Sequence, residues 1–296
     1  MSKVNFTSST PLLLNGREVA FEVLEKVKNE INLLRAKNKR APGLAVILVG
    51  ENPASYTYVK NKEKKCIELG IYSEVHRLEA SISEKELIKL VESLNNNKNI
   101  DGILIQLPLP DHIKAEKIIE HIDPAKDVDG LHPYNLGNLF SGYKSLMPCT
   151  PQGVMEILKH YSINISGALA VVIGRSTLVG KPLATLLLQG NATVTVTHSK
   201  TINIEDISRS ADILISAIGK PKLVTKDWVK SNAIIIDVGI NQIHENGTTK
   251  LVGDVDFESV SSICKAITPV PGGVGPVTIA MLMSNTLLAY KMRDEG

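Results

Sequence analysis

Two hydrophobic periods alternate along this chain. Residues 16–40 place apolar side chains three or four positions apart with charged residues between them, which predicts an amphipathic helix that ends before Pro42-Gly43. The run LAVILVG at residues 44–50 is short and apolar, which is typical of a strand buried on both faces. The chain therefore opens with a helix followed by a buried strand.

The same alternation continues to about residue 121. The predicted elements are a helix at 54–69 with Gly70 at its C-cap, a strand at 73–78, a helix opened by a capping box of Ser83 and Glu86, a strand in DGILIQLPLP (101–110) that stops at two prolines, and a further helix. Strands that alternate with helices predict a parallel sheet with helices on both faces.

A second alternating series begins near residue 166. Its predicted strands, the first three of which precede helix-like segments, are ALAVVIG (168–174), ATVTVTH (192–198), ADILISAIG (211–219) and AIIIDVG (233–239). A turn-rich segment at 123–149 and a helix at 150–161 lie between the two series, and an apolar helix follows at 277–292.

These two series predict an α/β fold with two α/β domains and a cleft between them. The first domain comprises residues 1–148 and is completed by the C-terminal helix, residues 277–296. The second domain, residues 149–276, is predicted to be a Rossmann-like parallel sheet.

Composition narrows the class of protein. The 296 residues are 43% hydrophobic and 22% charged with a formal net charge of +2, as in soluble globular proteins, and this balance gives no reason to expect a nucleic-acid partner. Three separated cysteines form no C-x-x-C pair, so neither a metal site nor a disulfide framework is expected. The first 16 residues lack a long apolar segment and no run reaches membrane-spanning length, which favours the cytoplasm.

The segment VVIGRSTLVGKP (171–182) is the first candidate for binding chemistry. It is not a P-loop, because five residues separate Gly174 from Gly180 and Pro182 replaces the magnesium-binding Ser or Thr. It also departs from the dinucleotide fingerprint, because Ser176 stands where the second glycine belongs. A strand, a turn and a helix start could still present N–H groups to phosphate, which favours a nucleotide site over an ordinary turn.

The next predicted strand indicates which nucleotide binds. NAD-binding folds commonly carry an Asp or Glu about 20 residues after the loop, where it holds the ribose 2′-hydroxyl. Here the strand ends in His198, Ser199, Lys200 and Thr201, with no carboxylate. Together with the planar guanidinium of Arg175, this cluster favours the 2′-phosphate of NADP over NAD.

A tyrosine and a lysine in the first half have helical spacing. Tyr58 and Lys62 share a face if SYTYVKNKEKKC (55–66) is a helix, and together they could transfer a proton. Taken alone, this segment is better explained as a solvated lysine-rich helix, although clustered ammonium groups and partial burial lower a lysine pKa toward the catalytic range. Short-chain dehydrogenases also carry a Tyr-x-x-x-Lys pair, but in them it follows the nucleotide loop. Here the pair precedes the loop at Gly174, so that family is excluded.

Three further segments are hard to explain as scaffold. Gln106 lies at the end of a predicted strand, where ligands gather in α/β sheets. Asp127 and Asp129 lie in PAKDVDGLHP, although carboxylates in turns often serve only to form the turn. TPVPGGVGPVT (268–278) combines three glycines with three prolines, which predicts a rigid loop with exposed backbone N–H groups.

Taken together, these segments resemble one family. The fragments that occur here in the order found in bifunctional methylenetetrahydrofolate dehydrogenase/cyclohydrolases are SYTYVKNKEKK, DGILIQLPLP, PAKDVDGLHP, PCTPQGV, VVIGRSTLVGKP, ADILISAIGKP, IIIDVGIN, GDVDF and TPVPGGVGPVT. The resemblance implies NADP-dependent oxidation of 5,10-methylenetetrahydrofolate to the methenyl cation, then hydrolysis to 10-formyltetrahydrofolate, in one-carbon metabolism. It also implies a homodimer joined largely through the cofactor domains, and no metal.

The resemblance further implies roles for residues at the motif positions. In the folate-binding domain, Lys62 would be the general acid/base, Tyr58 would contact the folate, Gln106 would orient Lys62 and Asp129 would grip the amino edge of the pterin. The loop residues that would line the folate cleft are Pro271, Gly272 and Gly273. The residues that would bind NADP are Gly174, Arg175, Ser176, Ser199 and Ile240.

Two alternatives stay open on the sequence. Another two-domain NADP oxidoreductase, similar to shikimate dehydrogenase, is disfavoured by the DVDG and PGGVGP segments. A folate-binding homologue without catalytic activity is disfavoured by the intact Tyr58 and Lys62, which do not exclude it.

Overall fold

A computed structural model describes residues 10–245 and 247–294 and divides the chain into two compact units. The first unit comprises Ala20–Cys149 and the described residues from Thr278 onward, and the second comprises the described residues up to Val19 together with Thr150–Val277. Residues 1–9, which contribute to the expectation that no signal peptide is present, lie outside the described residues.

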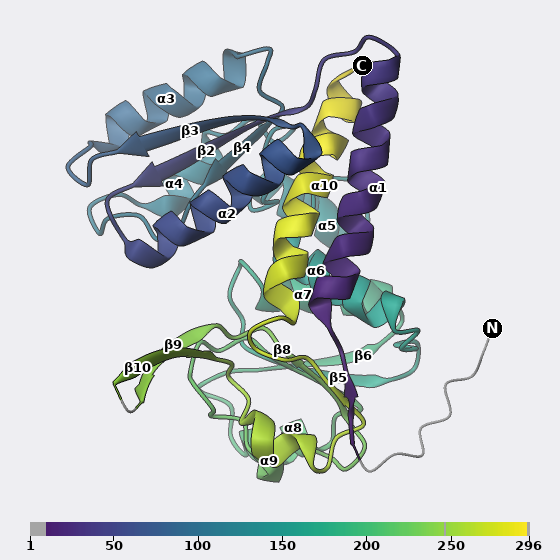
Figure 1. The fold of residues 1–296 in the computed structure, drawn as a ribbon. Helices are drawn as coiled ribbons and strands as arrows, with labels where there is room; N and C mark the ends of the chain where they lie inside the picture. The colour runs from purple at the N-terminus through teal and green to yellow at the C-terminus, as the bar shows by residue number, and fades with distance from the viewer. Residues whose placement is uncertain (1–9, 246, 295–296) are drawn as a thin grey trace. The chain divides into compact units, whose positions relative to one another are not determined.

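The first unit is built on a three-stranded sheet (Figure 1). Its elements are most of α1 (Gly16–Ala36), β2 (Gly43–Val49), α2 (Pro53–Leu69), β3 (Tyr72–Leu78), α3 (Glu84–Asn96), β4 (Gly102–Ile105), α4 (Ala115–Glu120), α5 (Pro133–Ser141) and most of α10 (Val274–Asp294). The strand order is β3-β2-β4, and all neighbours run parallel. Every side chain of β2 is buried, as predicted for a strand covered on both faces.

Two helices of this unit pack on one face of its sheet. Side chains of α3 and α4 form a buried cluster with alternate residues of β2 and β4; its members include Leu87, Val91, Ile118, Ala45, Ile47, Ile103 and Ile105. The intervening residues of β2 point to the opposite face, because successive side chains of a strand alternate. Burial on both faces fixes the strand register. The register in turn fixes the position of Gln106, which directly follows β4 at its carboxyl end.

Two local predictions in the first unit are confirmed by their hydrogen bonds. The Ser83 side chain accepts the Glu86 N–H and the Glu86 side chain accepts the Ser83 N–H, which completes the predicted capping box of α3. Gly70 has a φ of 73° directly after α2, and its N–H donates to the Ile67 carbonyl, as expected for a C-cap in the left-handed region.

The second unit contains a six-stranded parallel sheet. Its elements are β1 (Leu12–Leu13), α6 (Cys149–His160), β5 (Leu169–Ile173), α7 (Gly180–Gln189), β6 (Thr193–Thr197), α8 (Ile204–Arg209), β7 (Ile213–Ser216), the 3-10 helix η1 (Lys226–Trp228), β8 (Ile234–Asp237), β9 (Asn241–Glu245), β10 (Thr248–Val252), α9 (Phe257–Ser261) and β11 (Ala266–Ile267). The strand order is β1-β11-β8-β7-β5-β6. The predicted class, two α/β domains with a Rossmann-like second sheet, is confirmed.

The N-terminal strand joins the second unit. β1 pairs in parallel with β11 at the edge of the six-stranded sheet, and the Leu12 N–H donates to the Lys265 carbonyl at 2.9 Å. The predicted first domain, residues 1–148, includes this strand, because a two-residue strand carries no detectable period in the sequence.

Three elements differ from the sequence expectations. α5 lies in a segment that was predicted to be only turn-rich, because Pro133 and Gly137 weaken the helix signal in the sequence. In the structure, the His132 side chain caps this helix by accepting the Tyr134 N–H. The segment after β7 contains only the short 3-10 helix η1 rather than an α-helix. The antiparallel hairpin β9–β10, which projects from the second unit in Figure 1, was not predicted, although Asn246-Gly247 is a hairpin signal in the sequence.

Candidate active site and cofactor site

The lysine predicted to be catalytic is held by the glutamine predicted to orient it. Lys62 lies on α2 one turn after Tyr58, and its Nζ donates to Gln106 Oε1 at 2.9 Å. Gln106 directly follows β4, and its own Nε2 donates to the Leu107 carbonyl at 2.8 Å. This second bond fixes the amide so that its oxygen faces the ammonium group.

The surroundings of Lys62 change its proton affinity. Burial lowers the pKa of Lys62 from its ordinary value, because the charged form loses hydration, while the negative charge of Asp129 acts in the opposite direction. The side chain is half-buried, so water and a small molecule can still reach it. A lysine with a lowered pKa exchanges protons closer to neutral pH than a free lysine does.

Asp129 is the carboxylate beside Lys62. Burial raises the pKa of Asp129, the charge of Lys62 lowers it and the charge of Asp127 raises it further. The turn that carries Asp129 is tied to α10, because Asn285 Nδ2 donates to the Val128 and Met147 carbonyls at 2.9 Å each. The site therefore holds one amine and one carboxylate whose pKa values are shifted toward each other.

Cys149 is a member of this cluster that sequence reasoning missed. Its Sγ donates to the Val128 carbonyl at 3.3 Å, and the thiol lies beside the Asp129 carboxyl group. Burial holds the pKa of the thiol well above its ordinary value, so Cys149 acts as a neutral donor. The only sequence signal was its place in the PCTPQGV fragment, because nothing in local spacing links it to Lys62.

The other acidic residue of the DVDG segment forms the turn. Asp127 Oδ2 accepts the His132 N–H at 2.8 Å and the Asn135 Nδ2 at 2.9 Å, and its carboxyl group is buried. His132 uses its ring nitrogen to cap α5. These contacts support Asp129 without bringing Asp127 or His132 to the lysine.

Tyr58 presents its ring at the surface of the first unit. The residue is 36% exposed, and partial burial raises the pKa of its phenol. The phenol therefore stays protonated at neutral pH and can donate a hydrogen bond, while its ring offers a flat apolar surface.

The predicted phosphate turn lies at the carboxyl end of β5. Gly174 has a φ of 121°, and a Cβ there would overlap the Ala217 carbonyl oxygen, so only glycine fits. Ser176 Oγ accepts the N–H groups of Val179 at 3.1 Å and Gly180 at 3.4 Å, which shapes the turn before α7. Arg175 is exposed and directly follows the glycine, so its guanidinium can reach a bound phosphate.

The end of β6 lies next to this turn. β5 and β6 pair in parallel with Ile173 opposite Thr197, and the Gly174 N–H donates to the Thr197 carbonyl at 2.9 Å. Residues 198–201 therefore start beside the turn, with Ser199 exposed and no carboxylate among them. A cation, hydroxyl groups and a glycine cradle at one sheet edge fit a dinucleotide that carries an extra phosphate.

Ile240 and the glycine-proline loop also belong to the second unit. Ile240, 44% exposed, follows β8, and a Cβ at Gly275 would lie 3.5 Å from Ile240 Cδ1. Pro271 is exposed, whereas Gly272 and Gly273 are buried. These three loop residues fall in the unit of the cofactor candidates and not in the unit of Lys62.

The part of the chain that the structure describes has neither a metal-binding cluster nor a membrane-spanning helix. Residues 10–245 and 247–294 contain no group of three or more His, Cys, Asp or Glu side chains arranged to hold a metal ion. Over the same residues, no helix combines the length and the apolar character needed to cross a bilayer.

Two protein-family models match nearly the whole chain. The catalytic domain of tetrahydrofolate dehydrogenase/cyclohydrolase matches residues 14–129, and the NAD(P)-binding domain of the same family matches residues 148–294. The chain belongs to this family. Relatives named bifunctional protein FolD include one from Campylobacter hominis, 56% identical over 95% of this chain and 98% of the relative, and one from Nitratiruptor, 52% identical over 96% and 99%.

Solved structures of family members have the same fold. The bifunctional FolD enzyme of Campylobacter jejuni is 50% identical, covers 95% of this chain and 99% of its own, and superposes with a TM-score of 0.91. The Trypanosoma brucei enzyme, solved with NADP and an inhibitor, is 39% identical over 97% of this chain and 99% of its own, with a TM-score of 0.93. A shikimate dehydrogenase from Thermus thermophilus, 15% identical with a TM-score of 0.51, shares the fold alone.

Family membership gives the chain its activity. It is a bifunctional enzyme that oxidises 5,10-methylenetetrahydrofolate with NADP as cofactor and hydrolyses the methenyl product to 10-formyltetrahydrofolate, in one-carbon metabolism. The predicted family, activity and cofactor are confirmed.

Proposed function

We propose that Lys62 is the proton-transfer group of the cyclohydrolase step. The observation that supports this role is the Lys62–Gln106 hydrogen bond of 2.9 Å on an amine whose pKa burial lowers. In its neutral form Lys62 takes a proton from the water that adds to the methenyl carbon. As the ammonium, it returns that proton to the ring nitrogen when the carbon–nitrogen bond breaks. The hydroxyl group of the adduct loses its own proton to solvent and becomes the formyl carbonyl, so hydrolysis of the cation releases one proton overall.

The other residues of the first unit hold the folate and the lysine. Gln106 orients Lys62, because its amide is itself fixed by the Leu107 carbonyl. Asp129 accepts hydrogen bonds from the amino edge of the pterin, and its charge keeps part of the Lys62 population protonated. Tyr58 packs its exposed ring against the folate one helical turn from Lys62.

The oxidation requires the second unit. The residues that bind NADP, which accepts a hydride when bound, are Gly174, Arg175, Ser176, Ser199 and Ile240. Pro271, Gly272 and Gly273 of the PGGVGP loop (271–276) line the folate site. Arg175 and Ser199 hold the 2′-phosphate, since residues 198–201 include no carboxylate that would repel it. The protein supplies position and electrostatics for this step, and the nicotinamide supplies the redox chemistry.

Incubating the protein with methylenetetrahydrofolate and either NADP or NAD tests this function directly. Reduced cofactor and the methenyl chromophore are followed together. Reduced cofactor should form faster with NADP, and the methenyl chromophore should appear and then decay as hydrolysis proceeds. Hydride transfer without decay would contradict the cyclohydrolase assignment.

Replacing Asp129 by asparagine is expected to shift the pH dependence of the cyclohydrolase. The Asp129 carboxylate raises the Lys62 pKa, so its loss lowers that pKa further. Because the neutral amine is the base, the rising limb of kcat against pH should move to lower pH. The rate of methenyl decay at saturating substrate, corrected for the uncatalysed reaction, measures this.

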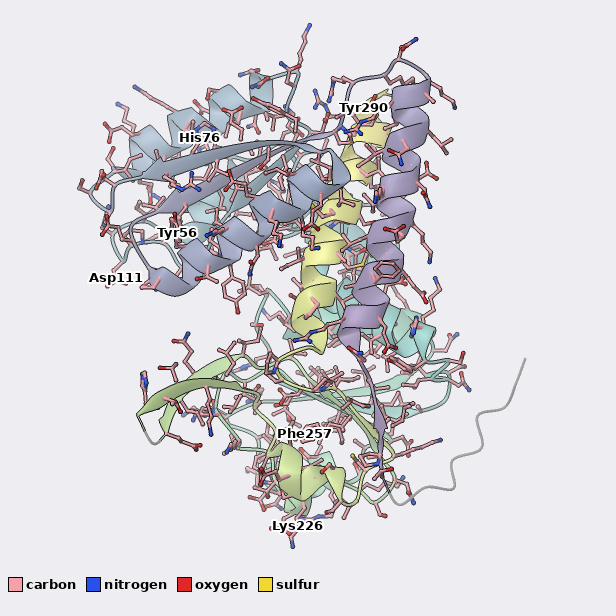
Figure 2. The ribbon with its side chains drawn as sticks, viewed as in Figure 1. Tyr56, His76, Asp111, Lys226, Phe257 and Tyr290 are labelled. Carbon is pink, nitrogen blue, oxygen red and sulfur yellow. The ribbon has the colours of Figure 1, made fainter. Side chains whose placement is uncertain are left out.

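The matched control is Asp111→Asn, which removes an exposed carboxylate that follows β4 in the same unit (Figure 2). Its kcat profile should coincide with that of the wild type. A shift of the Asp129→Asn limb to higher pH would contradict the proposed coupling between the two groups.

We further propose a homodimer joined through the cofactor units. β6 is an edge strand of the six-stranded sheet, its sequence TVTVT favours strand pairing, and Val196 is 38% exposed. Two copies can pair these edges antiparallel about a two-fold axis. Sedimentation velocity should give twice the chain mass of 32.1 kDa, and Val196→Lys should weaken the dimer; a wild-type monomer would contradict the proposal.

We place the enzyme in the cytoplasm. The thiols of Cys66, Cys149 and Cys264 are free and buried, which is typical of proteins that work in a reducing compartment.

A further inference from the structure

Two buried aspartates lie behind the carboxyl edge of the six-stranded sheet. Asp237 ends β8 within the segment DVG (237–239), and Asp254 lies in the segment GDV (253–255) after β10. Asp254 is 0% exposed and Asp237 is 3% exposed, so neither can touch a ligand. Both segments belong to fragments that carry the family resemblance, yet the proposed function gives neither aspartate a role.

Asp254 gathers the backbone of the loop after β7. Its Oδ2 accepts the Ile218 N–H at 2.7 Å and the Gly219 N–H at 3.2 Å, and its Oδ1 accepts the Lys220 N–H at 2.9 Å. The Ser216 hydroxyl donates to Oδ2 at 3.3 Å. One carboxylate thus fixes three consecutive peptide groups. An asparagine could not replace it, because one of its two terminal atoms is an N–H donor and only one oxygen can accept.

The same carboxylate reaches the loop after β8. Asn241 Nδ2 donates to Asp254 Oδ1 at 3.0 Å, and a Cβ at Gly239 would overlap that oxygen. Ile240, a proposed NADP contact, lies between these two residues. Asp254 therefore fixes residues 239 and 241 on either side of Ile240.

The two segments interlock reciprocally. Asp237 Oδ1 accepts the Asp254 N–H at 3.0 Å, and its Oδ2 accepts the Val255 N–H at 2.9 Å. A Cβ at Gly253 would overlap Asp237 Oδ2, just as one at Gly239 would overlap Asp254 Oδ1. Each aspartate thus fills the space that the other segment's glycine leaves open, which explains why both segments pair an aspartate with a glycine.

The loop fixed by Asp254 supports the phosphate turn. The Ala217 carbonyl, one residue before the peptide groups that Asp254 holds, packs against the Cα of Gly174, where a Cβ would overlap its oxygen. A movement of residues 217–220 would therefore displace the turn that carries Arg175 and Ser176. The chain of contacts runs from one buried carboxylate to both loops that flank the proposed NADP position.

We propose that Asp254 is a positioning residue for NADP, which fixes the loops at residues 217–220 and 239–241 and, through Ala217, the turn at Gly174. This inference rests on the proposed cofactor site in the second unit. It assigns the dehydrogenase and the cyclohydrolase different sensitivities to Asp254, because hydrolysis neither oxidises nor reduces its substrate and needs no NADP.

The test uses the full-length Asp254→Asn variant. The Kd for NADP, measured by direct titration, and the KM for NADP should rise by about tenfold or more, the lower end of the effect of losing a hydrogen bond to a charged group. The cyclohydrolase kcat/KM should stay within about twofold of the wild type, since this activity does not use the loops. If Asp254 served stability alone, Asp254→Asn would have a lower melting temperature, and its dehydrogenase and cyclohydrolase activities would fall together; this result would overturn the inference.

The matched control is Asp212→Asn. Asp212 is a carboxylate of the same unit that accepts the Leu169 N–H at 2.9 Å, but at the amino end of β5, away from the loops. Its NADP affinity should equal that of the wild type. If Asp254→Asn and Asp212→Asn behave alike, the inference is wrong.

Two further variants separate the ways in which the proposal could fail. Arg175→Ala reports on the cofactor site itself: unchanged NADP affinity in this variant would overturn that site, whereas a loss there with none in Asp254→Asn would overturn only the positioning role. If Asp254→Asn does not fold, Ser216→Ala removes a single hydroxyl donor to Asp254. It should raise the KM for NADP by about twofold to fivefold with unchanged hydrolysis, and an unchanged KM would overturn the inference.

Discussion

Replacing Lys62 by methionine is expected to abolish the cyclohydrolase while folate binding largely survives. Methionine keeps most of the length and apolar surface of the side chain but cannot carry a proton. The loss of a positioned acid/base group lowers the rate by a factor on the order of 10²–10⁴. Decay of the methenyl chromophore measures hydrolysis, and direct titration with a folate measures binding.

Two other lysine variants sharpen this result. Lys62→Arg keeps the positive charge, but a guanidinium stays protonated and cannot act as a base, so hydrolysis should also be lost. Lys60→Met removes an exposed lysine from the same helix and should leave hydrolysis unchanged. An unaltered rate in Lys62→Met, or full activity in Lys62→Arg, would contradict proton transfer by Lys62.

Replacing Arg175 by alanine is expected to weaken NADP much more than NAD. In the proposed cofactor site the exposed guanidinium of Arg175 binds the extra phosphate, and the loss of a hydrogen bond between charged groups costs about 1.5–3 kcal/mol. NAD lacks that phosphate, so its binding should change little. The KM values for the two cofactors, measured with saturating methylenetetrahydrofolate, give the difference.

Lys181→Ala is the matched control, because it removes an exposed cation from the start of α7 a few residues beyond the turn. It should affect the two cofactors equally or not at all. Equal losses of NADP and NAD in Arg175→Ala would show that this arginine does not recognise the 2′-phosphate.

The sequence predicted those parts of the fold that a local period or a local hydrogen bond determines. β2 could be predicted because its sequence is a continuous apolar run, as expected of a strand buried on both faces. α3 could be predicted because Ser83 and Glu86 form its capping box within four residues. α5 was not, because it depends on a histidine cap and on Asp127, whose contacts are not local features of the pattern. Short edge strands such as β1 have no period to detect.

The candidate site shows the same limit. The lysine-rich helix around Lys62 looks solvated in the sequence, and only packing brings Gln106, from 44 residues away, to within 2.9 Å of its amine. Cys149 and Asp254 escaped notice for this reason, since their partners lie on other elements. The turn at Gly174 could be predicted because a strand, a glycine and a helix start are contiguous in the chain.

Titration of the Lys62 side chain tests directly whether this residue transfers the proton. Protein labelled with 13C at lysine Cε gives one resonance for each lysine, and the signal missing from Lys62→Met identifies Lys62. We expect the Lys62 pKa to lie below the 10.5 of an unperturbed lysine, and to be lower still in Asp129→Asn. A Lys62 that titrates at or above 10.5 would contradict this expectation.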